Sequence, residues 1–288
     1  MKRHKGFIDL HTHGIGRYDT RTAEPEDILK IAELHGKAGT AAILPTIYSS
    51  DSKTMRSNIG AVKKAMRVQQ NSSCVTDYAS RILGVHIEGP FLNPVRCGAL
   101  DKSSFLKPSI SSFRKLIDGY GDVVKLVTIA PEIPGAMRLI EFCSGNGISV
   151  NMGHSDATFK EAMDGKKSGA TGITHLFNAM RPFHHREPGL AGFGLIDRDI
   201  YTEVIADGVH LSIETLKIVF NIKDSRRIIL VSDSVKNQKR GPVYEKSGVL
   251  AGSGITISDS VKLLKSIGVS NAGISNASFH NPTRYLSI

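Results

Sequence analysis

The chain has 288 residues and a formal net charge of +10, with 37 Lys and Arg against 27 Asp and Glu. This length allows one or two domains, and many α/β barrels of this size are single domains. No apolar run approaches the ~20 residues of a membrane-spanning helix, so we expect no membrane segment. The positive charge indicates a solvated basic surface or an attraction to anionic substrates. Nucleic acid is not expected as a partner, because the chain has no basic tail and no Trp.

The cysteines and the N-terminus both indicate the cytoplasm. Cys74, Cys97 and Cys143 are widely spaced and form neither a CxxC motif nor a disulfide pattern, which fits a reducing compartment. The sequence enters an apolar strand at about residue 6, which leaves no room for the apolar segment of a signal peptide. We therefore expect a cytoplasmic protein.

Apolar runs that predict β-strands recur along the chain, and most are separated by a segment with helical spacing. The eight predicted strands cover residues 6–13, 40–46, 81–90, 123–132, 148–152, 171–175, 201–210 and 227–233. The predicted helices between them cover residues 26–38, 52–70, 134–143, 157–168 and 212–221.

This alternation predicts an α/β fold, a (β/α)₈ TIM-like barrel. The strand runs are nearly continuous in apolar character, as expected for parallel strands buried on both faces. We expect a single catalytic barrel domain over 1–288, with its strands between about 6 and 233. The polar segment 237–248 is predicted to be a loop, and 256–288 to be a C-terminal helical segment.

Polar side chains recur at the carboxyl ends of these strands, the end at which such barrels build their active sites. His11 and His13 face the same way, because side chains in a strand alternate with a period of two. His154 and His175 end two neighbouring strands, on either side of one predicted helix. The full set at this rim is His11, His13, Glu88, His154, His175, Asp207, His210 and Asp233.

Imidazole and carboxylate groups at one rim predict a divalent metal site, with zinc favoured. The metal would lower the pKa of a bound water towards ~7, and a free carboxylate nearby could take its proton. Each residue alone has another explanation: a strand-end His commonly bonds to the backbone, Glu88 could belong to a turn, and Asp233 could cap a helix. Their shared placement favours the metal site.

A separate basic cluster follows the sixth strand. His184, His185 and Arg186 could form a solvated loop or capture an anion such as phosphate, for which the planar fork of Arg is suited. Arg181 adds another cation, and Asn178 with nearby loop amides could hold sugar hydroxyls.

These motifs together resemble the N-acetylglucosamine-6-phosphate deacetylase family of the amidohydrolase superfamily. The order and spacing of the matching segments run through nearly the whole chain. They are residues 6–14, 84–94, 130–132, 153–158, 174–180, 184–189, 206–210, 231–233 and 250–253.

The resemblance implies a role for each matching residue. Glu88, His154 and His175 are the expected ligands of the principal metal, and His11 and His13 hold a second ion in members that keep both histidines. Asp233 is the expected general acid and base. The expected substrate contacts are Ala99, Asn178, Ala179, Arg186, Asp207, His210, Leu250, Ala251 and Gly252.

The implied reaction is hydrolysis of the N-acetyl group of N-acetylglucosamine 6-phosphate. One or two divalent ions are expected, zinc first, with iron, cobalt, manganese or nickel as alternatives. The only implied partner besides this small amino-sugar phosphate is a second copy of the chain, because relatives associate through the barrel. A homodimer formed by barrel loops near the active site is therefore expected.

Three departures from the family pattern keep other functions open. Leu100 replaces a family His that contacts substrate. The segment between Asp233 and Leu250 is shorter than usual, with Ser234-Val235 after the Asp. The strands of a small β-sandwich domain are not seen at either end. The alternatives are a deacetylase of a different N-acyl amino sugar and a catalytically weak barrel that binds a sugar phosphate.

Overall fold

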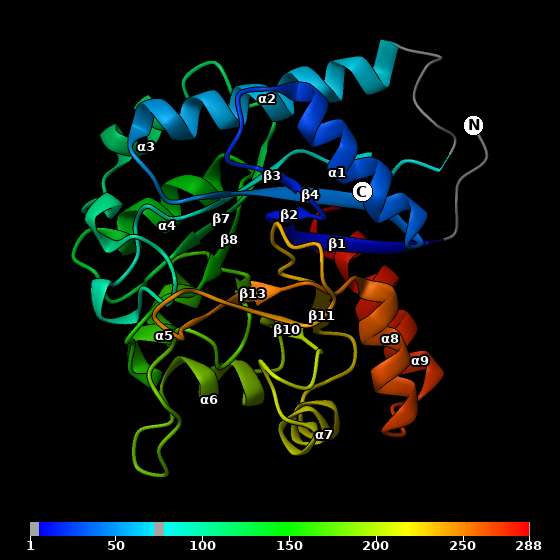
Figure 1. Cartoon of the computed structure of the whole chain (residues 1–288). Coiled ribbons are helices and arrows are strands. Elements are labelled where there is room, and N and C mark those ends of the chain that lie inside the picture. The colour runs from blue at the N-terminus through cyan, green and yellow to red at the C-terminus, as the bar shows by residue number, and fades with distance from the viewer. Residues whose placement is uncertain (1–5, 72–77, 288) are drawn as a thin grey trace.

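The computed structural model describes residues 6–71 and 78–287, and in them eight parallel strands curve into a barrel with helices outside (Figure 1). The order around the barrel follows the chain, as the (β/α)₈ prediction required. The strands are β1 (Phe7–Thr12), β4 (Thr40–Tyr48), β6 (Val85–Glu88), β7 (Val124–Ile129), β8 (Ser149–Met152), β9 (Gly172–Ile173), β10 (Tyr201–Ile205) and β11 (Ile228–Val231). A two-residue strand, β5 (Arg81–Ile82), pairs with β4 outside this ring.

The barrel closes between β1 and β11 at the end where the polar residues gather. The amide of Asp233 donates to the carbonyl of His11 at 2.9 Å, and the amide of His13 donates to the carbonyl of Ser234 at 2.7 Å. Buried His35 reinforces this seam, since its Nε2 lies 3.0 Å from Thr12 Oγ1 and 3.3 Å from Ser234 Oγ. The closure therefore sets His11 and His13 beside Asp233.

Helices cover the outer face of the strands, and each predicted helix is present. They are α1 (Pro25–Lys37), α2 (Ser52–Asn71), α4 (Ala136–Gly145), α5 (Phe159–Lys167) and α7 (Ile213–Ile222). Local chemistry fixes their starts: Thr158 and Glu161 form a capping box at α5, and the hydroxyl of Ser212 accepts the amide of Thr215 at α7.

Two further barrel helices were not predicted from the sequence. The helix α3 (Ile110–Ile117) is short and follows a polar, irregular segment. The helix α6 (Gly189–Ile196) contains three glycines and is buried along nearly its whole length. Its surroundings exclude larger side chains: a Cβ at Gly194 would lie 2.7 Å from Ile173 Cδ1. Tertiary packing, rather than helical propensity, makes this segment a helix.

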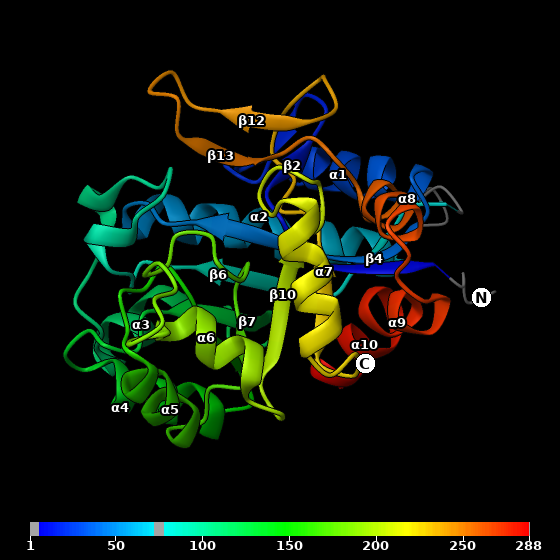
Figure 2. The same ribbon diagram turned by 90° about the horizontal axis from the view of Figure 1, so that it is seen from below.

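The C-terminal segment contains α8 (Ile257–Ser266), α9 (Asn271–Ser275), a π-helical turn (Asn276–His280) and α10 (Asn281–Tyr285). The loop predicted over 237–248 is wrong in part. Residues of β12 (Pro242–Tyr244) pair antiparallel with β13 (Leu250–Ser253), and this hairpin projects from the barrel body (Figure 2). Its strands are short and partly exposed, so no alternation of apolar and polar residues predicts them from the sequence.

The apolar core has two parts. The larger one fills the space between strands and helices, and the smaller one includes Leu44, Leu126, Ile229 and Tyr285. Among the described residues, no helix has the length and apolar character needed to cross a bilayer. Cys97 and Cys143 are free thiols, and Cys74 lies outside the described residues.

Candidate metal and active site

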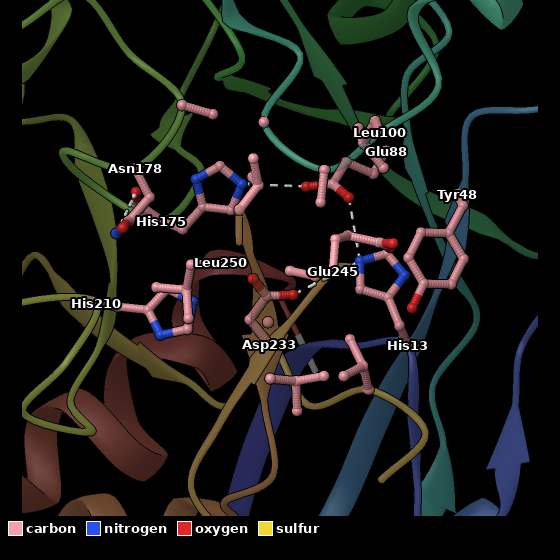
Figure 3. A pocket seen from close by; sticks show the side chains of 18 of the residues that line it. His13, Tyr48, Glu88, Leu100, His175, Asn178, His210, Asp233, Glu245 and Leu250 are labelled. Carbon is pink, nitrogen blue, oxygen red and sulfur yellow. Dashed lines mark hydrogen bonds and ion pairs between the residues drawn. The ribbon is translucent and has the colours of Figure 1, made fainter. Parts of the chain in front are cut away.

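A cavity of about 480 Å³ opens at the carboxyl ends of the strands, a size typical of sites for small molecules. His13, Glu88, His175 and Asp233 reach its wall (Figure 3). His154 lines it as well. His11 is fully buried behind them. The structure therefore brings the whole predicted metal set to one place.

The first group of potential ligands consists of Glu88, His154 and His175. Glu88 Oε1 lies 3.1 Å from His154 Nε2 and 3.1 Å from His175 Nε2, and the two imidazole nitrogens are 3.1 Å apart. Three strand ends, those of β6, β8 and β9, supply these side chains. One imidazole lone pair pointed at another is unfavourable without a cation between them, so this geometry fits a divalent ion.

The second group consists of His11, His13 and Asp233. The two Nε2 atoms are 3.2 Å apart, and Asp233 Oδ1 lies 3.5 Å from His11 Nε2 and 3.6 Å from His13 Nε2. Glu88 joins the two groups, because its Oε2 is 3.0 Å from His13 Nε2 while its Oε1 belongs to the first group. A carboxylate so placed can serve two ions.

Supporting acceptors fix the imidazoles so that Nε2 faces the cavity. The Nδ1 of His154 lies 3.0 Å from the carbonyl oxygen of Arg96, and the Nδ1 of His13 lies 3.0 Å from the carbonyl oxygen of Thr46. A proton held on Nδ1 leaves Nε2 with a free lone pair, which is the arrangement that metal-binding histidines use.

Three of these residues adopt a backbone conformation that L-amino acids rarely occupy. His154, His175 and Asp233 have φ angles of +47°, +27° and +45°. Such strain costs on the order of 1–3 kcal/mol per residue and persists at functional sites where surrounding contacts enforce it. The sharp turn after each strand directs the side chain back into the barrel mouth.

The imidazoles and carboxylates of the two groups shift one another's pKa values. Burial by itself would lower the pKa of His11, but the carboxylates of Glu88 and Asp233 raise that pKa well above its usual value. Burial would raise the pKa of Glu88, yet His11 and the neighbouring imidazoles hold it well below the usual range. The carboxylates thus favour positive charge between them, as a cation site requires.

A model of the Amidohydrolase family matches residues 6–270. The chain belongs to the amidohydrolase family. It is 32% identical over 282 residues to the N-acetylglucosamine-6-phosphate deacetylase of Lysinibacillus sphaericus, covering 91% of this chain and 70% of that protein. It is 29% identical to the N-acetylgalactosamine-6-phosphate deacetylase of Escherichia coli O157:H7, covering 98% of this chain and 77% of that protein.

A solved structure supports the same relationship. The N-acetylglucosamine-6-phosphate deacetylase of Thermotoga maritima superposes with a TM-score of 0.86 at 31% identity, covering 98% of this chain and 78% of that chain. This amidohydrolase is therefore a member of the N-acetylglucosamine-6-phosphate deacetylase family, and the predicted barrel is confirmed.

Most of the predicted substrate contacts lie on the wall of this amidohydrolase's cavity. They are Ala99, Asn178, Ala179, His210, Leu250, Ala251 and Gly252. Leu100 lines it as well, where the family pattern has a His. Asp207 does not line the cavity, but its Oδ2 accepts a hydrogen bond from His210 Nδ1 at 2.7 Å and so orients that ring.

Arg186 is not among the residues that line the cavity. It is exposed in the segment between β9 and α6, where its Nη1 contacts His185 Nε2 at 3.0 Å. Local sequence gave no way to foresee this, because the neighbouring Asn178 and Ala179 do reach the cavity.

Sequence reasoning also missed side chains on the opposite wall. Tyr48 at the end of β4 stacks on His13, with ring centroids 3.7 Å apart, and the guanidinium of Arg21 lies 3.7 Å above the Tyr48 ring. Lys236 and Glu245, on the segment that leads into the β12–β13 hairpin and on its turn, line the cavity too. These residues carry no motif, and only the closure of the barrel brings them to the site.

The motif residues Glu132 and Asp156 support His154 from outside the cavity. Glu132 accepts the hydroxyl of Ser155 at 2.7 Å and the amide of Asp156 at 2.6 Å. Asp156 in turn pairs with Arg96 and Arg181. The network fixes the strained turn that carries His154.

Proposed function

We propose that this amidohydrolase removes the N-acetyl group from N-acetylglucosamine 6-phosphate, releasing acetate and glucosamine 6-phosphate. The observation that carries the proposal is the convergence of Glu88, His154 and His175 on one point beside Asp233, at the wall of a cavity of about 480 Å³. Glu88, His154 and His175 would hold the principal divalent ion, zinc being favoured by the donor set. His11 and His13 would help to hold a second.

When bound, the ion supplies Lewis-acid activation of water and of the amide carbonyl. Asp233 accepts the proton of the attacking water through its carboxylate and passes it to the departing nitrogen. A C–O bond forms, the amide C–N bond breaks, and acetate and the amino sugar result. His11 and His13 Nε2 lie within 3.6 Å of Asp233 Oδ1, which supports its place beside the reacting atoms.

Substrate orientation is assigned to the wall on which His210, Asn178 and Ala179 lie. His210 is held by Asp207 and can hydrogen-bond to the substrate through its remaining nitrogen. The β12–β13 hairpin brings Leu250 and Ala251 over the cavity and limits the access of water. These groups fit a compact polar sugar rather than a long chain.

The galactosamine epimer is a second candidate substrate. Leu100 at the cavity wall cannot hydrogen-bond through its side chain, which removes one discriminating contact, and the Escherichia coli relative is named for N-acetylgalactosamine 6-phosphate. Acetate release should be measured with both epimers, each with and without the 6-phosphate. If neither phosphorylated epimer is hydrolysed, the proposed function is wrong.

Replacing Arg186 with Ala should reduce kcat/KM for the phosphorylated substrate by about 10- to 150-fold, because hydrogen bonds to charged groups contribute ~1.5–3 kcal/mol. The unphosphorylated sugar should lose almost nothing. Arg226→Ala, an exposed Arg that pairs with Asp224, is the matched control and should behave as wild type. Equal losses with both sugars would argue against phosphate recognition by Arg186.

We propose that two copies of the chain associate through the face formed by residues 181–188, α6 and α7. Phe183 lies before α6, and Ile196 and Ile222 end α6 and α7. Their side chains are 53%, 61% and 57% exposed, and α6 packs beside α7 (Figure 2). Exposed apolar side chains that gather on one face commonly mark an interface. Arg186 belongs to the same face, so a second copy could present it to the cavity of the first.

Light scattering at micromolar concentration should give the mass of a dimer, and the double substitution Ile196→Lys and Ile222→Lys should give a monomer. The dimer should also bind the phosphorylated sugar more tightly than the monomer does. An active wild-type monomer with full preference for the phosphorylated sugar would contradict this arrangement.

We also propose a cytoplasmic location, which the free thiols of Cys97 and Cys143 support.

A further inference from the structure

A row of buried polar side chains crosses the barrel interior beneath the candidate metal site. The hydroxyl of Tyr285, on α10, donates to Asn151 Oδ1 at 2.5 Å, and Asn151 Nδ2 donates to Glu203 Oε1 at 2.8 Å. Glu203 Oε2 lies 3.2 Å from His11 Nδ1. Glu203 and Asn151 are each 1% exposed. The row therefore connects the C-terminal helix to a potential metal ligand without passing through solvent.

Glu203 is the junction of this row. Besides His11 and Asn151, its carboxylate lies 3.4 Å from the backbone amide of His175, so it meets one residue of each ligand group. A carboxylate buried this deeply is costly unless donors surround it. Here the His11 ring, the Asn151 side-chain amide and the His175 backbone amide supply those donors.

The contact with Glu203 decides which nitrogen of His11 carries the proton. A carboxylate can only accept, so Nδ1 of His11 must donate, and Nε2 is left with its lone pair towards His13, Glu88 and Asp233. His13 and His154 meet backbone carbonyls at the equivalent position. A charged acceptor makes the imidazole a stronger ligand than a carbonyl does.

Asn151 and Tyr285 hold Glu203 in turn. Since the Tyr285 hydroxyl occupies Asn151 Oδ1, the amide must direct its NH₂ group at Glu203. Gly172 of β9 leaves space for the row: a Cβ there would lie 2.0 Å from Asn151 Oδ1 and 2.6 Å from the Tyr285 hydroxyl. Any larger residue at position 172 would displace both side chains, so the strand is built around them.

We propose that Glu203 is a positioning residue for the metal site, holding His11 in the tautomer that binds metal, and that Asn151 and Tyr285 hold Glu203. This inference deepens the proposed function and rests on it for the role of the ions. It also makes Tyr285 of the C-terminal helix α10, more than 270 residues from His11 in the chain, part of the support of the site.

The test is zinc binding by the metal-free full chain, measured by calorimetric titration. Glu203→Gln should weaken the ion held by His11 and His13 by about 10- to 100-fold, the usual cost of losing a supporting partner, and should leave the other ion little changed. Tyr285→Phe should weaken the same ion to a smaller degree. Tyr201→Phe is the matched control, since this ring packs beside Tyr285 but its hydroxyl meets only Arg227.

A second measurement needs no metal. In the metal-free protein labelled with ¹⁵N-histidine, at a pH high enough to make the His11 ring neutral, His11 should be protonated at Nδ1 in the wild type, and the Nε2-protonated form should increase in Glu203→Gln. The thermal midpoint of each variant confirms that the chain is folded. Unchanged zinc affinities together with an unchanged His11 tautomer would overturn the proposal. If the variants show the expected changes in zinc affinity and His11 tautomer but the wild type releases no acetate, only the proposed function is overturned.

Discussion

Replacing His175 with Ala is expected to abolish turnover and to remove the principal ion. His175 Nε2 lies 3.1 Å from both Glu88 Oε1 and His154 Nε2, so it provides one of three converging donors. Loss of a direct ligand should cost more metal affinity than the ~10–100-fold that loss of a supporting partner costs. The remaining Glu88 and His154 leave too few ligands for a tetrahedral site.

Bound metal should be measured by elemental analysis after dialysis against trace metal, in parallel with acetate release. His280→Ala is a suitable control, because His280 is exposed on the C-terminal segment, far along the chain from the site. The thermal midpoint separates loss of metal from loss of fold. If His175→Ala retains both metal and turnover, the ligand assignment is wrong.

Replacing Asp233 with Asn should keep the fold and the principal ion but lower kcat by ~10²–10⁴-fold, the usual contribution of positioned proton transfer. Asn has the same shape, and the backbone bonds of Asp233 to His11 and Ser253 do not depend on its carboxylate. The amide cannot take a proton from water at neutral pH, so the loss should appear in kcat more than in KM.

Zinc titration of this variant adds a second readout. The ion near His11 and His13 should bind more weakly, since Asp233 Oδ1 lies 3.5 Å and 3.6 Å from their Nε2 atoms. The principal ion, near His154 and His175, should not change. Asp118→Asn, an exposed carboxylate that ends α3, controls for the loss of one charge. Near wild-type kcat in Asp233→Asn would exclude the proton-transfer role.

The sequence by itself determined the barrel and indicated which side chains would meet at its rim. Apolar runs long enough for strands alternate with helical segments. Because parallel strands in such a barrel are buried on both faces, each can be recognised from its own continuous apolar run. Glu88, His154 and Asp233 each follow such a run, and the carboxyl ends of parallel strands must meet at one rim. Local pattern and topology together therefore predicted that these side chains lie close together, as they do in the structure.

Tertiary structure alone decided the rest of the cavity wall and the support beneath it. Arg21, Tyr48 and Lys236 reach the cavity because the barrel closes, while Arg186, beside motif residues in the chain, stays outside. The β12–β13 hairpin and α6 form through packing that no local period reveals.

Glu203 illustrates the physical reason most clearly. In the sequence it is one polar residue within an apolar strand, with no motif around it, and its partner His11 is 192 positions away. Hydrogen bonds between such distant residues depend on register and curvature around the whole barrel, which are set by the sum of many packing contacts. Strand identity is a local property of the chain, whereas contacts across the interior of a barrel are not.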